Sequence, residues 1–375
     1  MSHTPHSGTA ARNAYIDLLR GAAIVCVLIL HFSLSYGIRQ SPIGLLPDAL
    51  IRALAQNGNY GVTIFFVISG YLITRLSLQR WGDLASIDAR AFYVMRVARI
   101  MPPLLPALAL IVVLGSLGVP SFSNTDGGHA LPASHFLLGA GSVLTFWHNV
   151  LMQSTGYFNY CLNIYWSLSV EEMFYLLLPL LCLTLRRTWM LVAACAALIV
   201  LAPCYRAAHS DNEIYYMYGY LACFDAIAIG CLCAMLERAW RPGPGLARAL
   251  RWGGAAAMAA LYVRGYEGIE ALGFSVMALC AGVFLMGAAG AAPMAALAAR
   301  ISAPLRWMGR HSYELYLYHI IVLALLRNLI VKADLTAVTR LLLLLLFVAV
   351  SCLLAALVAR YVAQPANLVL RRRLL

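Results

Sequence analysis

The stretch YIDLLRGAAIVCVLILHF, residues 15–32, is long and apolar enough to enter a lipid bilayer, yet it carries three ionisable side chains. Asp17 and Arg20 are three positions apart, and His31 follows Arg20 by eleven, close to three whole turns of a helix. All three side chains therefore fall on one face, with Arg20 and His31 about 16 Å apart along the axis. An ionisable group at the centre of a membrane helix costs roughly 2.5–3.5 kcal/mol. The stripe therefore predicts the polar seam of a membrane-embedded site.

The composition of the whole chain predicts an integral membrane protein. Of the 375 residues 62% are hydrophobic and 11% are charged, whereas soluble globular proteins are about 25% charged. Apolar runs near 20 residues, separated by short charged connections, indicate an all-α, polytopic helical bundle rather than a barrel. We expect about ten transmembrane helices, at 15–37, 59–78, 99–118, 168–185, 188–205, 215–236, 251–264, 271–290, 313–331 and 339–361.

The distribution of arginines predicts how the chain is threaded through the membrane. The net charge of +12 fits basic cytoplasmic loops and does not require a nucleic-acid partner. With the N-terminus inside, the basic clusters stay inside only if the ambiguous stretch 134–152 does not cross. We therefore expect ten crossings, both termini cytoplasmic, and 134–152 re-entrant or at the outer surface. The charges expected in outer loops are Arg39, Arg52, Arg206, Arg264 and Lys332.

The chain is expected to form a single transmembrane domain, residues 14–365. A flexible cytoplasmic segment, 1–13, would precede it, and a basic cytoplasmic tail, 366–375, would follow. No small-residue cleavage signal follows the first apolar run, so we interpret that run as a retained span. The ten cysteines show no paired framework. We expect Cys231 and Cys233 to pack within a helix, and we expect no metal site.

Two polar features occur in and after the second span. The span GVTIFFVISGYLITRL, residues 61–76, contains Ser69-Gly70, a pair more often used for close helix packing than for a site. The following loop ends in RVAR, which places Arg96 and Arg99 on one face at the mouth of the third span. Two guanidinium groups suit a phosphorylated ligand. An anchor for lipid headgroups explains them equally well.

Acidic residues also occur in apolar segments. Glu171 and Glu172 lie near the start of the span that follows NIYWSLS, and the helix dipole favours one carboxylate there. Adjacent residues point about 100° apart, so we expect one of the pair to face inward. Asp225 is a lone acid at mid-span, which predicts either a functional role or a buried arginine partner.

A histidine late in the chain matches the spacing of a helical face. In RHSYELYLYHIIV, the side chains of Tyr313, Tyr316 and His319 recur at steps of three. A single histidine on such a face is commonly structural. With His31 available as a partner, a site and a structural role are equally supported.

Together these residues resemble the acyltransferase-3 family of membrane acyltransferases, which modify glycans, antibiotics and other hydroxylated acceptors. The matching pieces occur in the family's order over residues 15–319. They are YIDLLRG with its later histidine, GVTIFFVISGYLI, RVAR followed by proline, WSLSVEEMFYLLLP and SYELYLYH. One departure is Thr63, which stands where many members have an acidic or amide residue.

The resemblance implies roles for particular side chains. It implies that His31 is the catalytic histidine and that Arg20 is its companion. Asp17 or Glu171 would orient the imidazole or balance its charge, and His319 falls on the histidine of a late motif. The residues implied to contact acyl-CoA are Arg96, Arg99, Ser69 and Tyr71.

The expected function is that of a membrane O-acyltransferase, most simply an O-acetyltransferase, in a bacterial inner membrane. It would move an acyl group from acyl-CoA, with no bound cofactor, to a hydroxyl of a polysaccharide, a lipid-linked glycan or an antibiotic. His31 would act as a general base or carry the acyl group transiently. The alternative is a transporter or flippase of a glycan or metabolite, because buried ionisable groups are also typical of carriers. The lack of repeat symmetry between the halves argues against that alternative.

Overall fold

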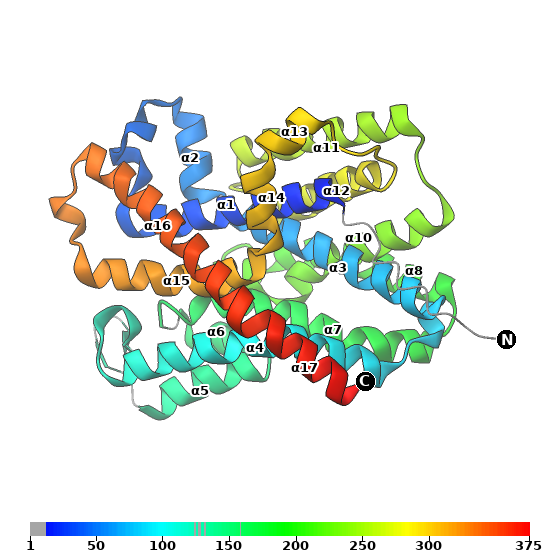
Figure 1. The fold of residues 1–375 in the computed structure, drawn as a ribbon, viewed down its shortest axis with the longest axis horizontal. Helices are drawn as coiled ribbons and strands as arrows, with labels where there is room; N and C mark the ends of the chain where they lie inside the picture. Colours follow the sequence, from blue (N-terminus) through cyan, green and yellow to red (C-terminus); the bar gives the residue numbers. More distant parts are fainter. Residues whose placement is uncertain (1–12, 124, 127–128, 131–132, 158) are drawn as a thin grey trace.

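The computed structural model describes residues 13–123, 125–126, 129–130, 133–157 and 159–375, and the chain is overwhelmingly helical (Figure 1). The expected flexible segment 1–13 lies, apart from Asn13, outside the described residues. The long helices are α1 (Ala14–Tyr36), α3 (Asn59–Trp81), α4 (Ala89–Ser116), α7 (Trp166–Leu185), α8 (Thr188–Ala208), α10 (Tyr220–Ala239), α11 (Pro244–Arg264), α12 (Glu270–Ala289), α15 (Ser312–Leu329) and α16 (Ala337–Val358).

Short elements connect these helices. The short α-helices are α2 (Asp48–Gln56), α5 (Ala133–Leu144), α6 (His148–Thr155), α9 (Glu213–Tyr218), α13 (Ala296–Ile301), α14 (Ala303–Arg310) and α17 (Gln364–Leu374). The 3-10 turns are η1 (Ile38–Gln40), η2 (Pro42–Leu45), η3 (Leu84–Ser86), η4 (Pro120–Phe122), η5 (Asn163–Tyr165) and η6 (Lys332–Asp334), and η7 (Ala359–Ala363) is a π-helical turn. The two-residue strands β1 (Thr125–Asp126) and β2 (His129–Ala130) form one antiparallel pair.

The predicted class, a polytopic helical membrane protein, is confirmed. Among the described residues, eight helical segments are long and apolar enough to cross a membrane. They cover eight of the ten spans expected from the sequence. The remaining two, 251–264 and 313–331, are helices α11 and α15, which are not among these eight segments. Ten crossings therefore stay a prediction.

The ambiguous stretch 134–152 is divided between two short helices. α5 has 12 residues and α6 has 8, whereas a membrane-spanning helix needs about 20. Phe146, in the turn between them, has a positive φ of 64°. This conformation is uncommon for a residue with a side chain and breaks the helix. The stretch therefore does not form a single spanning helix, in line with the expectation that it does not cross.

Close helix packing at the centre depends on two glycines. Helix α10 packs against α3 and α8, and α1 packs against α3 and α14 (Figure 1). A Cβ atom on Gly70 of α3 would meet the carbonyl oxygen of Ile227, and one on Gly230 of α10 would meet the carbonyl oxygen of Val67. The thiol of Cys231 lies 3.6 Å from the carbonyl oxygen of Gly70. Gly70 therefore has the packing role that its Ser-Gly motif predicts.

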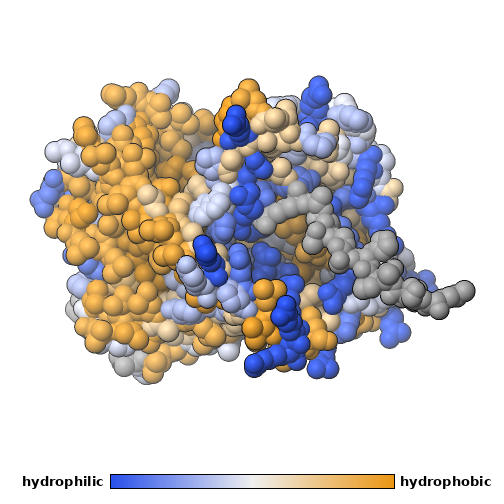
Figure 2. Space-filling model, in the orientation of Figure 1, coloured by the Kyte–Doolittle hydropathy of each residue, from blue (hydrophilic) through white to orange (hydrophobic). Residues whose placement is uncertain are grey.

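Asn13, the first described residue, and the start of α17 line one wide cavity, which we call the mouth cavity. It is formed by the start of α1, the end of α3, part of α4, the junction of α14 and α15, and α17. Asn13 and Gln364 both lie on its wall. Figure 2 shows hydrophilic residues gathered toward this part of the molecule, where α17 ends in Figure 1, and apolar residues covering the other part. We call this the basic side, and the side that carries α2 the opposite side.

The C-terminal segment differs from a simple tail. Residues 366–375 were expected to form a basic cytoplasmic tail, but the chain is helical up to Leu374 as part of α17. Helix α17 packs against α4. The segment therefore belongs to the folded bundle.

A buried ion pair accounts for the lone acid at mid-span. The expectation that Arg206 is an outer-loop charge is wrong, because its side chain is fully buried at the end of α8. Its Nη2 lies 2.8 Å from Oδ2 of Asp225, and Ser275 donates a hydrogen bond of 2.5 Å to the same oxygen. Arg206 Nε also donates to the carbonyl oxygen of Ala271 at 2.8 Å. Of the two predicted roles for Asp225, the structure supports the buried arginine partner.

Removing one partner of this pair should destabilise the bundle strongly. We expect Asp225→Ala to cost about 3–5 kcal/mol, because it leaves a buried guanidinium without its counter-charge. The double variant Arg206→Met with Asp225→Leu should recover most of the loss. Thermal unfolding in detergent, followed by intrinsic fluorescence, measures both. Asp48→Ala is the control, since Asp48 forms an exposed pair with Arg39 on the opposite side. If Asp225→Ala melted like the control, the pair would have no structural role.

Candidate functional site

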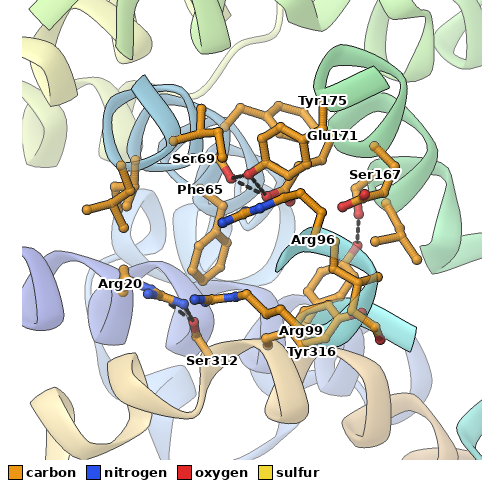
Figure 3. Close-up of a pocket in the computed structure, with 18 of the residues that line it drawn as sticks. Arg20, Phe65, Ser69, Arg96, Arg99, Ser167, Glu171, Tyr175, Ser312 and Tyr316 are labelled. Carbon is orange, nitrogen blue, oxygen red and sulfur yellow. Dashed lines mark hydrogen bonds between the residues drawn. The ribbon is translucent and has the colours of Figure 1, made fainter. Parts of the chain in front are cut away.

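A second cavity, which we call the inner cavity, lies where α1, α3, α4, α7 and α15 meet (Figure 3). It has an empty volume of about 970 Å³, including its opening. Five of the nine predicted site residues line it: Arg20, Ser69, Arg96, Arg99 and Glu171. Most of the apolar part of the remaining wall comes from α3, with side chains such as Phe65 and Leu72. The four helices that carry these five residues, α1, α3, α4 and α7, thus meet around one cavity.

Glu171 is held by a compact hydrogen-bond cluster. Its Oε1 accepts a hydrogen bond of 2.5 Å from the hydroxyl of Tyr175, one helical turn later on α7, and another from Ser69 on α3. The Ser69 and Tyr175 hydroxyls are 2.5 Å apart. The guanidinium of Arg96 lies 5.0 Å from the centre of the Tyr175 ring, in cation–π contact (Figure 3). Ser69 therefore lines the cavity, whereas its neighbour Gly70 permits close packing of α3 against α10.

Both adjacent glutamates face the inner cavity. The expectation was that one of Glu171 and Glu172 faces inward, but both line the wall, and Glu172 is buried. The cavity curves around α7, so two directions about 100° apart both open into it. Sequence reasoning also missed Tyr175. The signal was present, because Tyr175 follows Glu171 by four positions and so shares its helical face.

Three guanidinium groups point into the same space. Arg20 donates from Nη2 and Nε to the hydroxyl of Ser312 at 2.9 and 3.2 Å, which ties α1 to the first residue of α15. Figure 3 shows Arg96 and Arg99 reaching from α4 toward Arg20. Arg96 and Arg99 share a helical face as predicted, although α4 begins at Ala89, so they lie well inside the helix. The inner cavity therefore combines apolar walls with a concentration of positive charge.

The inner cavity shares its boundary with the mouth cavity. Arg20, Arg99 and Tyr313 line both spaces. Asp17 lines the mouth cavity only, and its side chain is buried. It precedes His31 by fourteen positions, about 21 Å along α1. Asp17 is therefore too far from His31 to orient its ring.

The two predicted histidines form a contact at the other end of α1. His319 Nε2 lies 3.3 Å from His31 Nδ1, and the ring centres are 4.9 Å apart. His31 Nδ1 is also 2.9 Å from the carbonyl oxygen of Val27, and His319 Nδ1 is 2.8 Å from that of Tyr316. A carbonyl oxygen only accepts, so both Nδ1 atoms carry the proton in the neutral rings. His319 Nε2 then accepts from His31, and His31 Nε2 keeps its lone pair.

This arrangement corrects one expectation about how His31 is oriented. The groups on its ring are the Val27 carbonyl and His319. Glu171, one of the two acids expected to perform that role, is instead engaged by Ser69 and Tyr175. His319 contacts His31, which the sequence analysis named as an available partner for it.

The predicted site therefore has two parts. His31 does not line the inner cavity, and the connection between them runs along α15. Tyr316 lines the cavity, and its ring centre lies 5.8 Å from that of His319. The Tyr316 hydroxyl donates to the Ile164 carbonyl at 2.8 Å and lies 2.5 Å from the Ser167 hydroxyl. The cationic cavity and the histidine pair thus lie at different positions along the same two helices, α1 and α15.

Further polar residues lie beyond His31, toward the opposite side. Ser35 follows His31 by one turn, and its hydroxyl is 2.7 Å from that of Tyr160. The guanidinium of Arg327 lies 4.2 Å from the centre of the Tyr160 ring. Sequence reasoning missed these residues. Only the position of Ser35 on the same helical face as His31 was a signal for them.

Two further residues of the resemblance lie elsewhere. Tyr71 lines neither cavity; its hydroxyl donates to Glu237 on α10 at 2.5 Å. Thr63 is buried in a small separate pocket beside Asp225. Within the described part of the chain, no group of three or more His, Cys, Asp or Glu side chains is placed to hold a metal ion.

Comparison with known proteins identifies the family. Residues 13–360 match the acyltransferase-3 family, described as "Acyltransferase domain". Peptidoglycan O-acetyltransferase OatA of Listeria monocytogenes is 27% identical over 83% of this chain and 49% of its own length. A putative peptidoglycan O-acetyltransferase, YrhL of Bacillus subtilis, is 24% identical over 83% of this chain and 48% of its own length. The chain thus spans about half the length of these relatives. No solved structure matches. As the motifs predict, the chain belongs to the acyltransferase-3 family.

Proposed function

We propose that this protein is a membrane O-acyltransferase that transfers an acyl group, most simply acetyl, from acyl-CoA to a hydroxyl of a cell-surface carbohydrate. Family membership supports acyl transfer. The names of two relatives, peptidoglycan O-acetyltransferases, support acetyl and a polysaccharide. The observation that carries the proposal is that α1 joins a cationic cavity on the basic side to a histidine with a basic nitrogen deeper in the bundle.

The donor would enter from the basic side. Coenzyme A has phosphate groups at its nucleotide end and a long, largely uncharged arm that ends in the thioester. Guanidinium groups bind phosphate bidentately. Arg20 and Arg99 supply two at the junction of the two cavities, and Arg96 supplies a third in the inner cavity. The apolar wall excludes water and strengthens these contacts. The arm would then point along α1 toward His31.

The acceptor would approach His31 from the opposite side. The lone pair on His31 Nε2 takes the proton of the acceptor hydroxyl while the hydroxyl oxygen attacks the thioester carbonyl. The carbon–sulfur bond breaks, and the CoA thiolate leaves and is protonated. In the alternative sequence, His31 Nε2 attacks the thioester carbonyl and the CoA thiolate leaves. The acceptor hydroxyl then displaces the imidazole from the acyl group, and its proton passes to the thiolate. In both, the Val27 carbonyl and His319 Nε2 hold the His31 ring by its Nδ1–H.

Replacing His31 should abolish turnover without unfolding the protein. We expect His31→Ala to lower acetyl-CoA turnover by about 10²-fold or more, the effect of removing a general acid–base group. Free thiol release in proteoliposomes, with a glycan fraction as acceptor, measures it. The control is His311→Ala, since His311 also contacts the carbonyl of the residue four positions earlier but lines neither cavity.

The outcomes of this experiment separate the classes of function. Thiol release that depends on His31 supports acyl transfer. No release from the folded wild-type protein, with several acceptors present, would contradict the proposal and favour a carrier. Release unchanged in His31→Ala would keep the enzyme class and remove His31 from the mechanism.

The arginines of α4 should govern donor binding rather than the chemical step. We expect Arg96→Gln to raise KM for acetyl-CoA by about tenfold or more, because a charge-assisted hydrogen bond contributes about 1.5–3 kcal/mol. The kcat value should change less. Initial rates at varied acetyl-CoA concentration separate the two. Arg39→Gln, an exposed arginine on the opposite side, should leave KM unchanged. A fall in kcat with no change in KM would contradict donor binding by Arg96.

A further inference from the structure

The C-terminal helix α17 borders the candidate donor site but lies outside the family match, which ends at residue 360. Helix α16 runs into the π-helical turn η7, and both η7 and α17 pack against α4. Figure 1 shows α17 lying alongside α4 near the end of the chain. Helix α4 is the one that carries Arg96 and Arg99. The C-terminal segment is therefore placed beside the arginine pair.

One face of α17 is turned toward the mouth cavity. Gln364, Asn367 and Leu368 line that cavity. Arg371 follows Asn367 by four positions and Leu368 by three, so it continues the same face one turn further on. Arg372 follows Leu368 by four positions and lies at the edge of this face, whereas Arg373 points to the opposite side of the helix. Of the arginines at the end of the chain, Arg371 thus continues the face that lines the mouth most directly, and Arg373 lies away from it.

Arg371 joins a cluster of positive charge. Its guanidinium is near enough to Arg80, Arg96 and Arg99 for their charges to act on it. The ion pairs found within the described residues involve none of these four arginines.

Carboxylates also line the two cavities, but guanidinium groups outnumber them at the mouth. The mouth cavity is lined by Arg20, Arg99 and Arg310, and by Arg75, which pairs with Glu237, against Asp17 and Glu314. Glu171 and Glu172 lie in the inner cavity together with Arg96 and Arg99. The Arg371 side chain is exposed, one helical turn beyond the residues of α17 that line the mouth.

Such an excess at an open cavity is the electrostatic signature of a polyanionic ligand. Like charges at close range repel, and phosphate oxygens relieve the repulsion while accepting bidentate hydrogen bonds. The nucleotide end of CoA carries a diphosphate and a ribose phosphate. A phospholipid headgroup offers the same chemistry at a membrane surface. Arg371 continues the face of α17 whose earlier residues line the mouth cavity, and this placement favours CoA.

We propose that Arg371 is a donor-binding residue that holds a phosphate group of the CoA nucleotide, and that α17 forms one wall of the donor site. This inference rests on the proposed acyl-CoA function. It adds a contact from a segment that the family match does not include. It also separates Arg371 from Arg373, which belongs to the same run of arginines but lies on the opposite side of the helix.

The test is CoA binding by purified full-length protein in nanodiscs of neutral phosphatidylcholine. Four proteins are compared: wild type, Arg371→Gln, Arg371→Lys and Arg373→Gln, the last being a control with the same charge change on the opposite side of α17. We expect Arg371→Gln to weaken CoA binding by about tenfold, as for loss of a charge-assisted contact, and Arg373→Gln to bind like wild type. Pantetheine, which lacks the nucleotide phosphates, should bind all four proteins equally. Arg371→Lys should restore part of the affinity for CoA.

Each other outcome overturns a definite statement. If wild type binds CoA and Arg371→Gln binds it as tightly as Arg373→Gln does, this inference fails while the proposed function stands. If Arg371→Gln loses pantetheine binding to the same extent as CoA binding, Arg371 has a structural role. If the variant differs from wild type only in nanodiscs containing anionic phosphatidylglycerol, the residue serves a lipid headgroup. If wild type binds no CoA, the proposed function fails, and this inference fails with it.

Discussion

Helix α1 carries ionisable side chains into the membrane because α15 supplies partners for two of them. Arg20 donates to Ser312 at the first residue of α15, and His31 contacts His319 two turns further along. An ionisable group without such partners would cost several kcal/mol in a bilayer. The two helices are almost 300 residues apart in sequence, yet they must stay in one register for both contacts to form. That register aligns the inner cavity with the histidine pair.

The sequence predicts well those features that depend on local pattern. Apolar runs located the long helices. Helical spacing placed Arg96 and Arg99 on one face. Features that depend on which helix faces which were less accessible. The partner of Asp225 is Arg206, and spacing carries no information about contacts between α8 and α10. From the sequence alone, Arg206 near a helix end is interpreted as a loop charge, because its burial depends on the packing of α10 against α8.

The Ser69-Gly70 pair shows why the site was only partly predictable. Neighbouring residues on a helix point about 100° apart, so one dipeptide can serve two surfaces. Gly70 permits contact with α10, and Ser69 reaches Glu171 across the cavity. An interpretation that assigns a single role to both residues is therefore correct for only one of them. The same geometry, applied to a cavity that curves around α7, brings both Glu171 and Glu172 to its wall. Tyr71 is the converse case, since its position in a matching motif did not place it at the cavity.

Basic residues in this protein meet two distinct demands. Arginine at the ends of membrane helices fixes orientation, and for that purpose any exposed position on the correct side suffices. Binding a phosphate group demands more, because the guanidinium must point into a space that the ligand can enter and must be short of carboxylate partners. Arg373 meets the first demand by position alone. Arg96 and Arg99 also point into the inner cavity, and the role proposed for Arg371 requires α17 to direct it into the neighbouring mouth. Direction, rather than the number of charges, therefore distinguishes a donor site from a topology signal in this bundle.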